Sequence, residues 1–357
     1  MGHVRSLFQM RTLSNLCFLD THGNKCLFSI AHANSVRGFK TTFFRKSRWP
    51  TRSSASRPKL EPVEPFEGLK LESGPVHLSR LWKPLCFTIC VSSGSFVCAA
   101  IWQYENMRSR AISLMKQPGR WLQEKLYGSK KLGLWRQEVN TWWNNLTEGQ
   151  RLFFPICFLN CLVFFAWRVP HFQGTMVRYF CSNPASRVLC WPMVLSTFSH
   201  YSAFHLLANM YVLHSFSSGA VASLGKEQFL GLYMSAGVIS SMFSYFHKTI
   251  TKQPGLSLGA SGAIMAVLGY VCTQYPDTKL HIILLPFFTF SAGSAIKVIL
   301  ALDAAGVLLG WKYFDHAAHL GGAACGILWS YWGNTYIWQK REPLLHWWHE
   351  LREGPIK

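Results

Sequence analysis

Three short motifs in apolar stretches of this 357-residue chain hold residue types that together could hydrolyse a peptide bond. One is a serine between glycines, Gly259-Ala260-Ser261-Gly262, and another is a histidine before two glycines, Ala318-His319-Leu320-Gly321-Gly322. The third carries His205 and Asn209. A serine hydroxyl attacks an amide only when a base accepts its proton and hydrogen-bond donors hold the oxyanion that forms. Together the motifs offer a nucleophile, a base and two donors, which are the parts of a serine protease working within a bilayer.

The sequence around the motifs predicts how these groups are presented. Ser261 follows Gly259 and falls in the first turn of an apolar helix. Backbone N–H groups in a first turn lack intrahelical partners and the helix dipole is positive there, so the Ser261 N–H can help to hold the oxyanion. His205 and Asn209 are four residues apart and project from one face of their helix. His200 lies one turn earlier and could support the same site.

A contact between Ser261 and His319 requires two helices to approach nearly backbone to backbone. Small residues spaced four apart provide for this, with Gly262 and Ala266 behind the serine and Ala318, Gly322 and Gly326 behind the histidine. Such residues also occur in ordinary helix packing, where Ser261 would be a buried hydroxyl bonded to a carbonyl. The joint occurrence of the motifs on three helices favours a catalytic site.

The composition indicates a membrane protein. The mean hydropathy is +0.12, with 15% aromatic and only 15% charged residues, which is too apolar for most soluble proteins. Apolar segments predict seven spans at 84–104, 152–168, 202–221, 227–247, 257–274, 293–311 and 317–334. We therefore predict an all-α polytopic membrane protein. It would have one extra span, a basic connector at 105–151, a six-span core at 152–334 and a tail at 335–357.

Two apolar stretches outside these spans have other predicted structures. The positions of Val139, Trp142, Trp143 and Leu146, at i, i+3, i+4 and i+7, predict an amphipathic helix on the membrane surface. The run Leu280–Phe290 is short and interrupted by a proline, so we interpret it as a loop that dips into the membrane interface.

The N-terminal residues 1–60 differ in kind from the rest of the chain. They contain eleven Lys and Arg but a single acid, Asp20, and many Ser and Thr, which is typical of a mitochondrial presequence. The alternative is a basic arm that binds anionic lipid or nucleic acid. The membrane domain behind this segment favours the presequence, with cleavage between Arg37 and Lys59 and an arm at 61–83. The expected location is the mitochondrial inner membrane, with no nucleic-acid partner.

The motif set resembles that of the rhomboid family of intramembrane serine proteases. The matching residues are His200-x4-His205-x3-Asn209, Gly259-x-Ser261-Gly262 and Ala318-His319-x2-Gly322, in the family's order. The presequence, the extra span, Trp142-Trp143-Asn144-Asn145 and the segment 314–319 resemble the mitochondrial branch of the family. The resemblance implies a dyad of Ser261 and His319 with no third acid, no metal and no cofactor. It also implies that His205, Asn209 and Ser261 form the oxyanion hole, supported by His200, Gly259 and Gly262.

The resemblance further implies what the protein acts on. The expected substrates are single-pass membrane proteins, cut at or within their spans, and the expected surroundings are inner-membrane lipid. The same resemblance implies a role in mitochondrial quality control, mitophagy and apoptosis. The sequence leaves open whether the protein forms an oligomer or a protease complex. The chain departs from bacterial relatives at Met265, where an aromatic residue often stacks on the histidine, so other contacts must orient His319.

Other classes of membrane protein fit the sequence less well. A metalloprotease would need a motif such as His-Glu-x-x-His, and an aspartyl protease would need two aspartates deep in spans, where only Asp303 is found. A proton relay through His205, Asp303 and His319 would leave the glycines around Ser261 unexplained. The strongest alternative is a non-catalytic rhomboid-like binding protein or chaperone, but both dyad residues are present.

Asp303 itself has two candidate roles. A carboxylate within a span is costly unless it is paired or hydrated, so this residue needs a specific reason to be there. It could orient His319 as the acid of a triad, or it could fill a structural, hydrogen-bonded role. Because the family needs only a dyad, we favour the structural role and expect Asp303→Asn to keep most activity.

Overall fold

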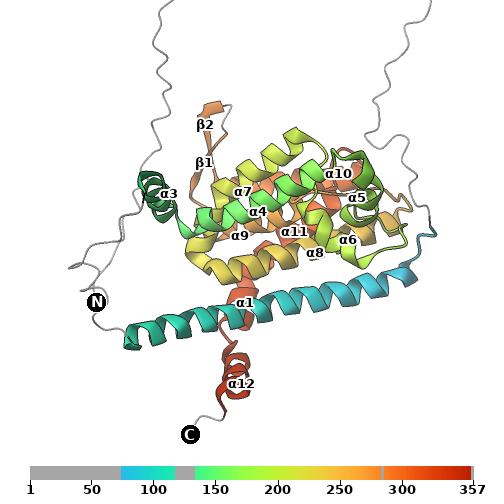
Figure 1. The fold of residues 1–357 in the computed structure, drawn as a ribbon. Helices are drawn as coiled ribbons and strands as arrows, with labels where there is room; N and C mark the ends of the chain where they lie inside the picture. Colours follow the sequence, from blue (N-terminus) through green and yellow to red (C-terminus); the bar gives the residue numbers. More distant parts are fainter. Residues whose placement is uncertain (1–73, 117–132, 283–284, 355–357) are drawn as a thin grey trace, which may run out of the picture. The chain divides into compact units, whose positions relative to one another are not determined.

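The computed structural model describes residues 74–116, 133–282 and 285–354. The predicted presequence at 1–60 and its cleavage region lie outside these residues. The described part is mostly helical, with one small hairpin, which agrees with the predicted all-α class (Figure 1).

The described residues form a series of helices of different lengths. The longer ones are α1 (Trp82–Lys116), α3 (Leu134–Asn145), α4 (Glu148–Ala166), α7 (Ala203–Leu224), α8 (Lys226–Ile250), α9 (Ser261–Gln274), α10 (Ala292–Leu309), α11 (His316–Leu328) and α12 (Glu342–Glu353). Shorter elements are η1 (Leu78–Leu81), η2 (Pro170–Phe172), α5 (Gln173–Phe180), α6 (Cys190–Leu195) and η3 (Ser196–Phe198). A π-helical segment, η4 (Trp329–Trp338), continues α11.

Every predicted span overlaps one of these helices, namely α1, α4, α7, α8, α9, α10 or α11. In the described part of the chain, four helices are long and apolar enough to cross a membrane by length and composition: α1, α4, α8 and α10. Helix α9 is apolar but shorter. The count of one plus six spans therefore stays a prediction.

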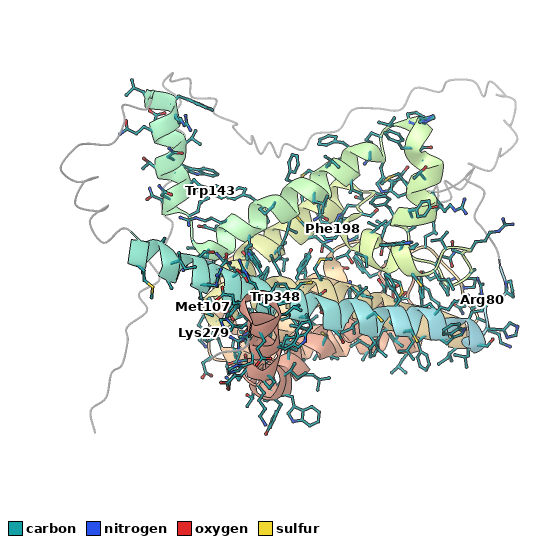
Figure 2. The ribbon with its side chains drawn as sticks, turned by 60° about the horizontal axis from the view of Figure 1, so that its bottom comes forward. Arg80, Met107, Trp143, Phe198, Lys279 and Trp348 are labelled. Atoms are coloured by element: carbon teal, nitrogen blue, oxygen red, sulfur yellow. The ribbon has the colours of Figure 1, made fainter. Side chains whose placement is uncertain are left out.

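Helix α1 runs past the predicted end of its span at residue 104 and continues to Lys116. The apolar pattern ends where the polar contacts of this helix with α12 begin. Trp348 of α12 donates a hydrogen bond to Glu105 at 3.0 Å, and Arg108 donates one to Glu353 of α12. Figure 2 labels Trp348 where α12 meets this part of α1. These contacts stabilise turns that the hydropathy of the sequence does not predict.

The two stretches outside the spans turn out differently. The amphipathic segment is a helix as predicted, α3, and none of its residues is buried. The interpretation of Leu280–Phe290 as a loop is wrong, because β1 (Lys279–Ile282) and β2 (Leu285–Ser291) form an antiparallel hairpin there. The register pairs Lys279 with Ser291 and His281 with Thr289. The run is rich in β-branched and aromatic residues, which favour paired strands.

Helix α9 lies at the centre of the bundle and packs against α7, α8, α10 and α11. Its contact with α11 is made by glycines. A Cβ added at Gly322 would overlap the carbonyl oxygen of Gly262, and one at Gly326 would overlap that of Ala266. The backbones of the two helices therefore touch, as the spacing of small residues predicts.

This packing predicts the effect of adding one methyl group. Gly326→Ala forces α11 away from α9, and overpacking of this kind costs about 1–3 kcal/mol of stability. We expect a lower midpoint in thermal unfolding of the detergent-solubilised protein. The matched control is Gly94→Ala in α1, where a Cβ would meet nothing within 4 Å and where alanine favours a helix by about 1 kcal/mol. Equal unfolding midpoints for the two variants would contradict the backbone contact.

Candidate active site

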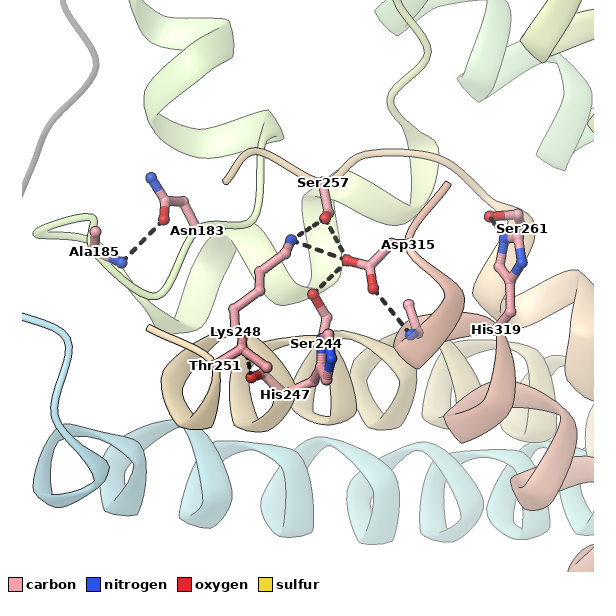
Figure 3. A network of polar contacts seen from close by, with 11 residues as sticks. Asn183, Ala185, Ser244, His247, Lys248, Thr251, Ser257, Ser261, Asp315 and His319 are labelled. Atoms are coloured by element: carbon pink, nitrogen blue, oxygen red, sulfur yellow. Dashed lines mark hydrogen bonds and ion pairs between the residues drawn. The ribbon is translucent and has the colours of Figure 1, made fainter. Parts of the chain in front are cut away.

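The structure brings the candidate nucleophile and base together at the heads of two packed helices. Ser261 is the first residue of α9, and His319 ends the first turn of α11, where its backbone N–H bonds to the Asp315 carbonyl at 3.1 Å. The Oγ of Ser261 and the Nε2 of His319 are 3.0 Å apart, and Figure 3 shows the two side chains beside each other. Both residues are partly exposed. This is the geometry in which an imidazole can accept a serine proton.

Two contacts hold the ring of His319 in this orientation. The Oδ1 of Asp303 lies 3.1 Å from its Nδ1, and the ring of Phe314 lies 6.2 Å away at an angle of 32°. A carboxylate accepts only, so Nδ1 carries the hydrogen and Nε2 keeps the lone pair that faces Ser261. Met265, at the position where bacterial relatives often have an aromatic residue, is buried in the core. Asp303 and Phe314 therefore take over the orienting role that the sequence left open.

A second histidine shares the same carboxylate oxygen. His316 is buried, and its Nδ1 lies 2.6 Å from Asp303 Oδ1. Gly306 of α10 makes room for the ring, because a Cβ there would overlap it. Asp303, His316 and His319 offer three possible metal-ligand atoms within 4.8 Å of one another. The two hydrogen bonds to one oxygen are a sufficient explanation of this arrangement.

On the other side of Ser261, His200 anchors the motif that carries the candidate oxyanion donors. Its Nε2 accepts hydrogen bonds from the Asn209 amide at 2.9 Å and from the Ala260 N–H at 3.3 Å. Burial, with a smaller effect from His205, lowers the pKa of His200 to about 3, so the ring is neutral and able to accept. The bonds join the segment before Ser261 to α7. They leave the second N–H of the Asn209 amide for another acceptor.

Gly259 is the residue that lets His205 approach Ser261. Its φ is +132°, a conformation that side chains rarely adopt, and an added Cβ would lie 2.8 Å from the His205 ring. Gly262 meets a similar limit, because a Cβ there would overlap the Ser240 side chain of α8. The glycines that flank Ser261 are thus needed for close packing on two sides.

Sequence reasoning singled out the segment 314–319 but missed the roles of Phe314, Asp315 and His316. The spacing His316-x-x-His319 could have suggested two imidazoles on related faces of one helix. Asp315 stands three residues before Ala318 and accepts its N–H at 3.0 Å, as an N-cap residue does. That cap fixes the start of the helix on which His319 lies.

Comparison with known proteins identifies the family. A rhomboid domain matches residues 189–334, which include all the candidate site residues. The presenilin-associated rhomboid-like protein of Homo sapiens is 54% identical over 297 residues, covering 83% of this chain and 78% of the relative. The chain belongs to the rhomboid family.

More distant members are also mitochondrial by name. Presenilin-associated rhomboid-like protein A of Danio rerio is 46% identical over 336 residues, with 87% of each chain covered. Rhomboid protein 1 of Saccharomyces cerevisiae is 31% identical over 198 residues, covering 55% of this chain and 57% of the relative. These relatives, together with the membrane-length helices, support a mitochondrial membrane protein.

The buried state of His200 predicts a dependence of stability on pH. An unfolded histidine binds a proton below about pH 6.5, whereas His200 in the fold does so only near pH 3. The unfolded state therefore gains protons first, and stability falls as the pH drops from about 6.5 toward 3. The unfolding equilibrium should shift by up to about tenfold per pH unit in this window. Chemical unfolding of the wild type and of His200→Gln at pH 7 and pH 5 should show a smaller loss in the variant, and equal losses would refute this.

The contact of Asp303 with His319 revises the expectation for Asp303→Asn. The amide oxygen of asparagine can still accept an imidazole N–H, but the negative charge is lost. Because charge-assisted hydrogen bonds exceed neutral ones by about 1 kcal/mol or more, the cleavage of a single-pass substrate that the sequence predicts should slow on the order of tenfold. Asp303→Ala should be slower still. An unchanged rate in Asp303→Asn would restore the purely structural role, and a loss equal to that of Ser261→Ala would make Asp303 an obligatory acid.

Proposed function

We propose that this chain is an intramembrane serine endopeptidase with Ser261 as nucleophile and His319 as general base. The observation that carries the proposal is the 3.0 Å contact between Ser261 Oγ and His319 Nε2. A buried structural serine would bond to a carbonyl, whereas this hydroxyl faces an imidazole nitrogen whose other side is held by a carboxylate. Membership of the rhomboid family supports the same assignment.

In the proposed mechanism His319 takes up and releases each proton that moves. Ser261 Oγ attacks the scissile carbonyl while His319 Nε2 accepts the hydroxyl proton, and the carbonyl oxygen becomes an oxyanion. The Ser261 N–H, His205 and Asn209 are the proposed donors for that oxyanion, each of them at the head of its helix or one turn within it. His319 then protonates the leaving amine, and water hydrolyses the acyl-enzyme by the same steps in reverse. The carboxylate of Asp303 stabilises the imidazolium that forms between these steps.

The substrate class follows from where this site lies. A nucleophile that heads a central helix of a membrane bundle can reach chains that enter the bundle, so we propose single-pass membrane proteins cut at or within their spans. We place the activity in the mitochondrial inner membrane, on the strength of the basic N-terminal segment and the mitochondrial relatives. A role in mitochondrial quality control, mitophagy and apoptosis rests on the resemblance alone.

Loss of either dyad residue should abolish cleavage. Because nucleophile and base act as a unit, Ser261→Ala and His319→Ala should each be inactive, and the double variant should be no worse. The assay is cleavage of a single-pass substrate in proteoliposomes that contain the full-length protein. A chelator should leave the wild-type rate unchanged, which separates hydrogen bonding in the Asp303 cluster from metal chemistry.

The matched control is Ser223→Ala, which removes a helix serine that bonds to Tyr270 instead of to an imidazole. It should cleave at the wild-type rate. Substantial cleavage by a correctly inserted Ser261→Ala would overturn the protease assignment and favour a binding or chaperone role.

A further inference from the structure

A second polar cluster includes the residues four positions before each dyad residue. It consists of Ser244 and Lys248 on α8, Ser257 in the segment before α9, and Asp315 at the start of α11 (Figure 3). Ser244, Lys248 and Ser257 belong to none of the motifs that carry the family resemblance, whereas Asp315 lies within the segment 314–319. Ser257 stands four residues before Ser261, and Asp315 stands four residues before His319.

Asp315 is the centre of the cluster. Its Oδ2 accepts hydrogen bonds from the hydroxyls of Ser244 and Ser257 and lies 3.0 Å from the ammonium of Lys248, which also donates to Ser257. Its Oδ1 accepts the Ala318 N–H at 3.0 Å. Burial alone raises the pKa of Asp315, but the Lys248 charge and these donors outweigh burial and hold the pKa below its usual range. The carboxylate is therefore ionised and has partners on three chain segments.

The cluster is largely shielded from water, which strengthens the interaction between its charges. The side chains of Lys248 and Asp315 are only 13% and 16% exposed. A charge pair shielded from water is screened less by solvent than a surface pair, and removing one partner leaves the other uncompensated. The pair therefore keeps its position, and backbone segments that are bonded to it are held in place.

The segment that leads into Ser261 is held at Ser257, in addition to the bonds that Gly259 and Ala260 make to Ser196 and His200. Ser257 pairs with Ser182 through two backbone hydrogen bonds, at 2.8 and 2.9 Å, while its side chain bonds to Asp315. The chain thus approaches Ser261 from a residue that is fixed on both its backbone and its side chain. The chain approaches His319 from Asp315 itself.

We propose that Lys248 and Asp315 are positioning residues that set the separation of Ser261 from His319. This inference rests on the proposed function and deepens it. The pair joins the last turn of α8 to the residues that precede the nucleophile and the base. When it is broken, the heads of α9 and α11 are free to shift relative to each other. A displacement of about 1 Å at reacting groups can cost on the order of 10²-fold in rate.

The test compares variants of the full-length protein in the proteoliposome cleavage assay. Lys248→Met should lower kcat on the order of 10²-fold with KM unchanged, because the substrate is still bound but the dyad is misaligned. The rate at which a fluorophosphonate labels Ser261 should fall in step, since that reaction needs the same alignment. Lys248→Arg keeps the charge and should restore most of both rates. Asp315→Asn keeps a capping oxygen but loses the ion pair, and should behave like Lys248→Met.

A control on the same helix separates positioning from stability. Ser241→Ala removes a buried hydroxyl on α8 that donates to the Met193 carbonyl at 3.1 Å, outside the cluster. It should lower the unfolding temperature while kcat and labelling rate stay at wild-type values. The proposal fails if Lys248→Met cleaves at the wild-type rate, or if its loss only matches the fraction of unfolded protein. Ser261→Ala in the same assay distinguishes failure of this proposal from failure of the proposed function, because activity in that variant would contradict the proposed function.

Discussion

The direct contact of the α9 and α11 backbones is the constraint on which the rest of the structure depends. Ser261 and His319 lie at the heads of these helices, and a hydrogen bond of 3.0 Å between them requires that no side chain hold the helices apart. Gly322 and Gly326 of α11 meet this requirement, since a Cβ at either position would overlap the backbone of α9. The same glycines carry little helix propensity, so the site is built at a local cost in stability that the packing of α9 on four neighbouring helices offsets.

The polar groups of the site follow a second rule, which is that every buried charge has partners. Asp303 accepts from two imidazoles, and Asp315 is paired with Lys248 and two hydroxyls. In an apolar bundle an unpaired carboxylate would be costly, so each acid is fixed in place by its partners. Fixed charges are also what catalysis needs, because groups that are already oriented do not have to reorganise as the transition state forms.

Much of this arrangement could be predicted from the sequence, and the rest could not for physical reasons. Apolar runs predict helices, and small residues four apart predict that α9 and α11 touch. Both features can be recognised in the sequence of a single helix. Which neighbour a side chain faces across the bundle depends on how the helices are arranged, and no single helix encodes this. Asp303 was therefore left with two roles, and His316 and Lys248 were overlooked. The hairpin at Lys279–Ser291 was missed because a short apolar run with a proline fits several structures equally well.

The central claim is that His319 activates Ser261 across the contact between the two helices. The most direct measurement is mass-spectrometric mapping of the adduct formed when a fluorophosphonate reacts with the full-length protein in membranes. The account predicts a single serine adduct, on Ser261, which is lost when His319 is replaced by alanine while the protein stays folded. An adduct elsewhere, or labelling of Ser261 that is equally fast without His319, would contradict it.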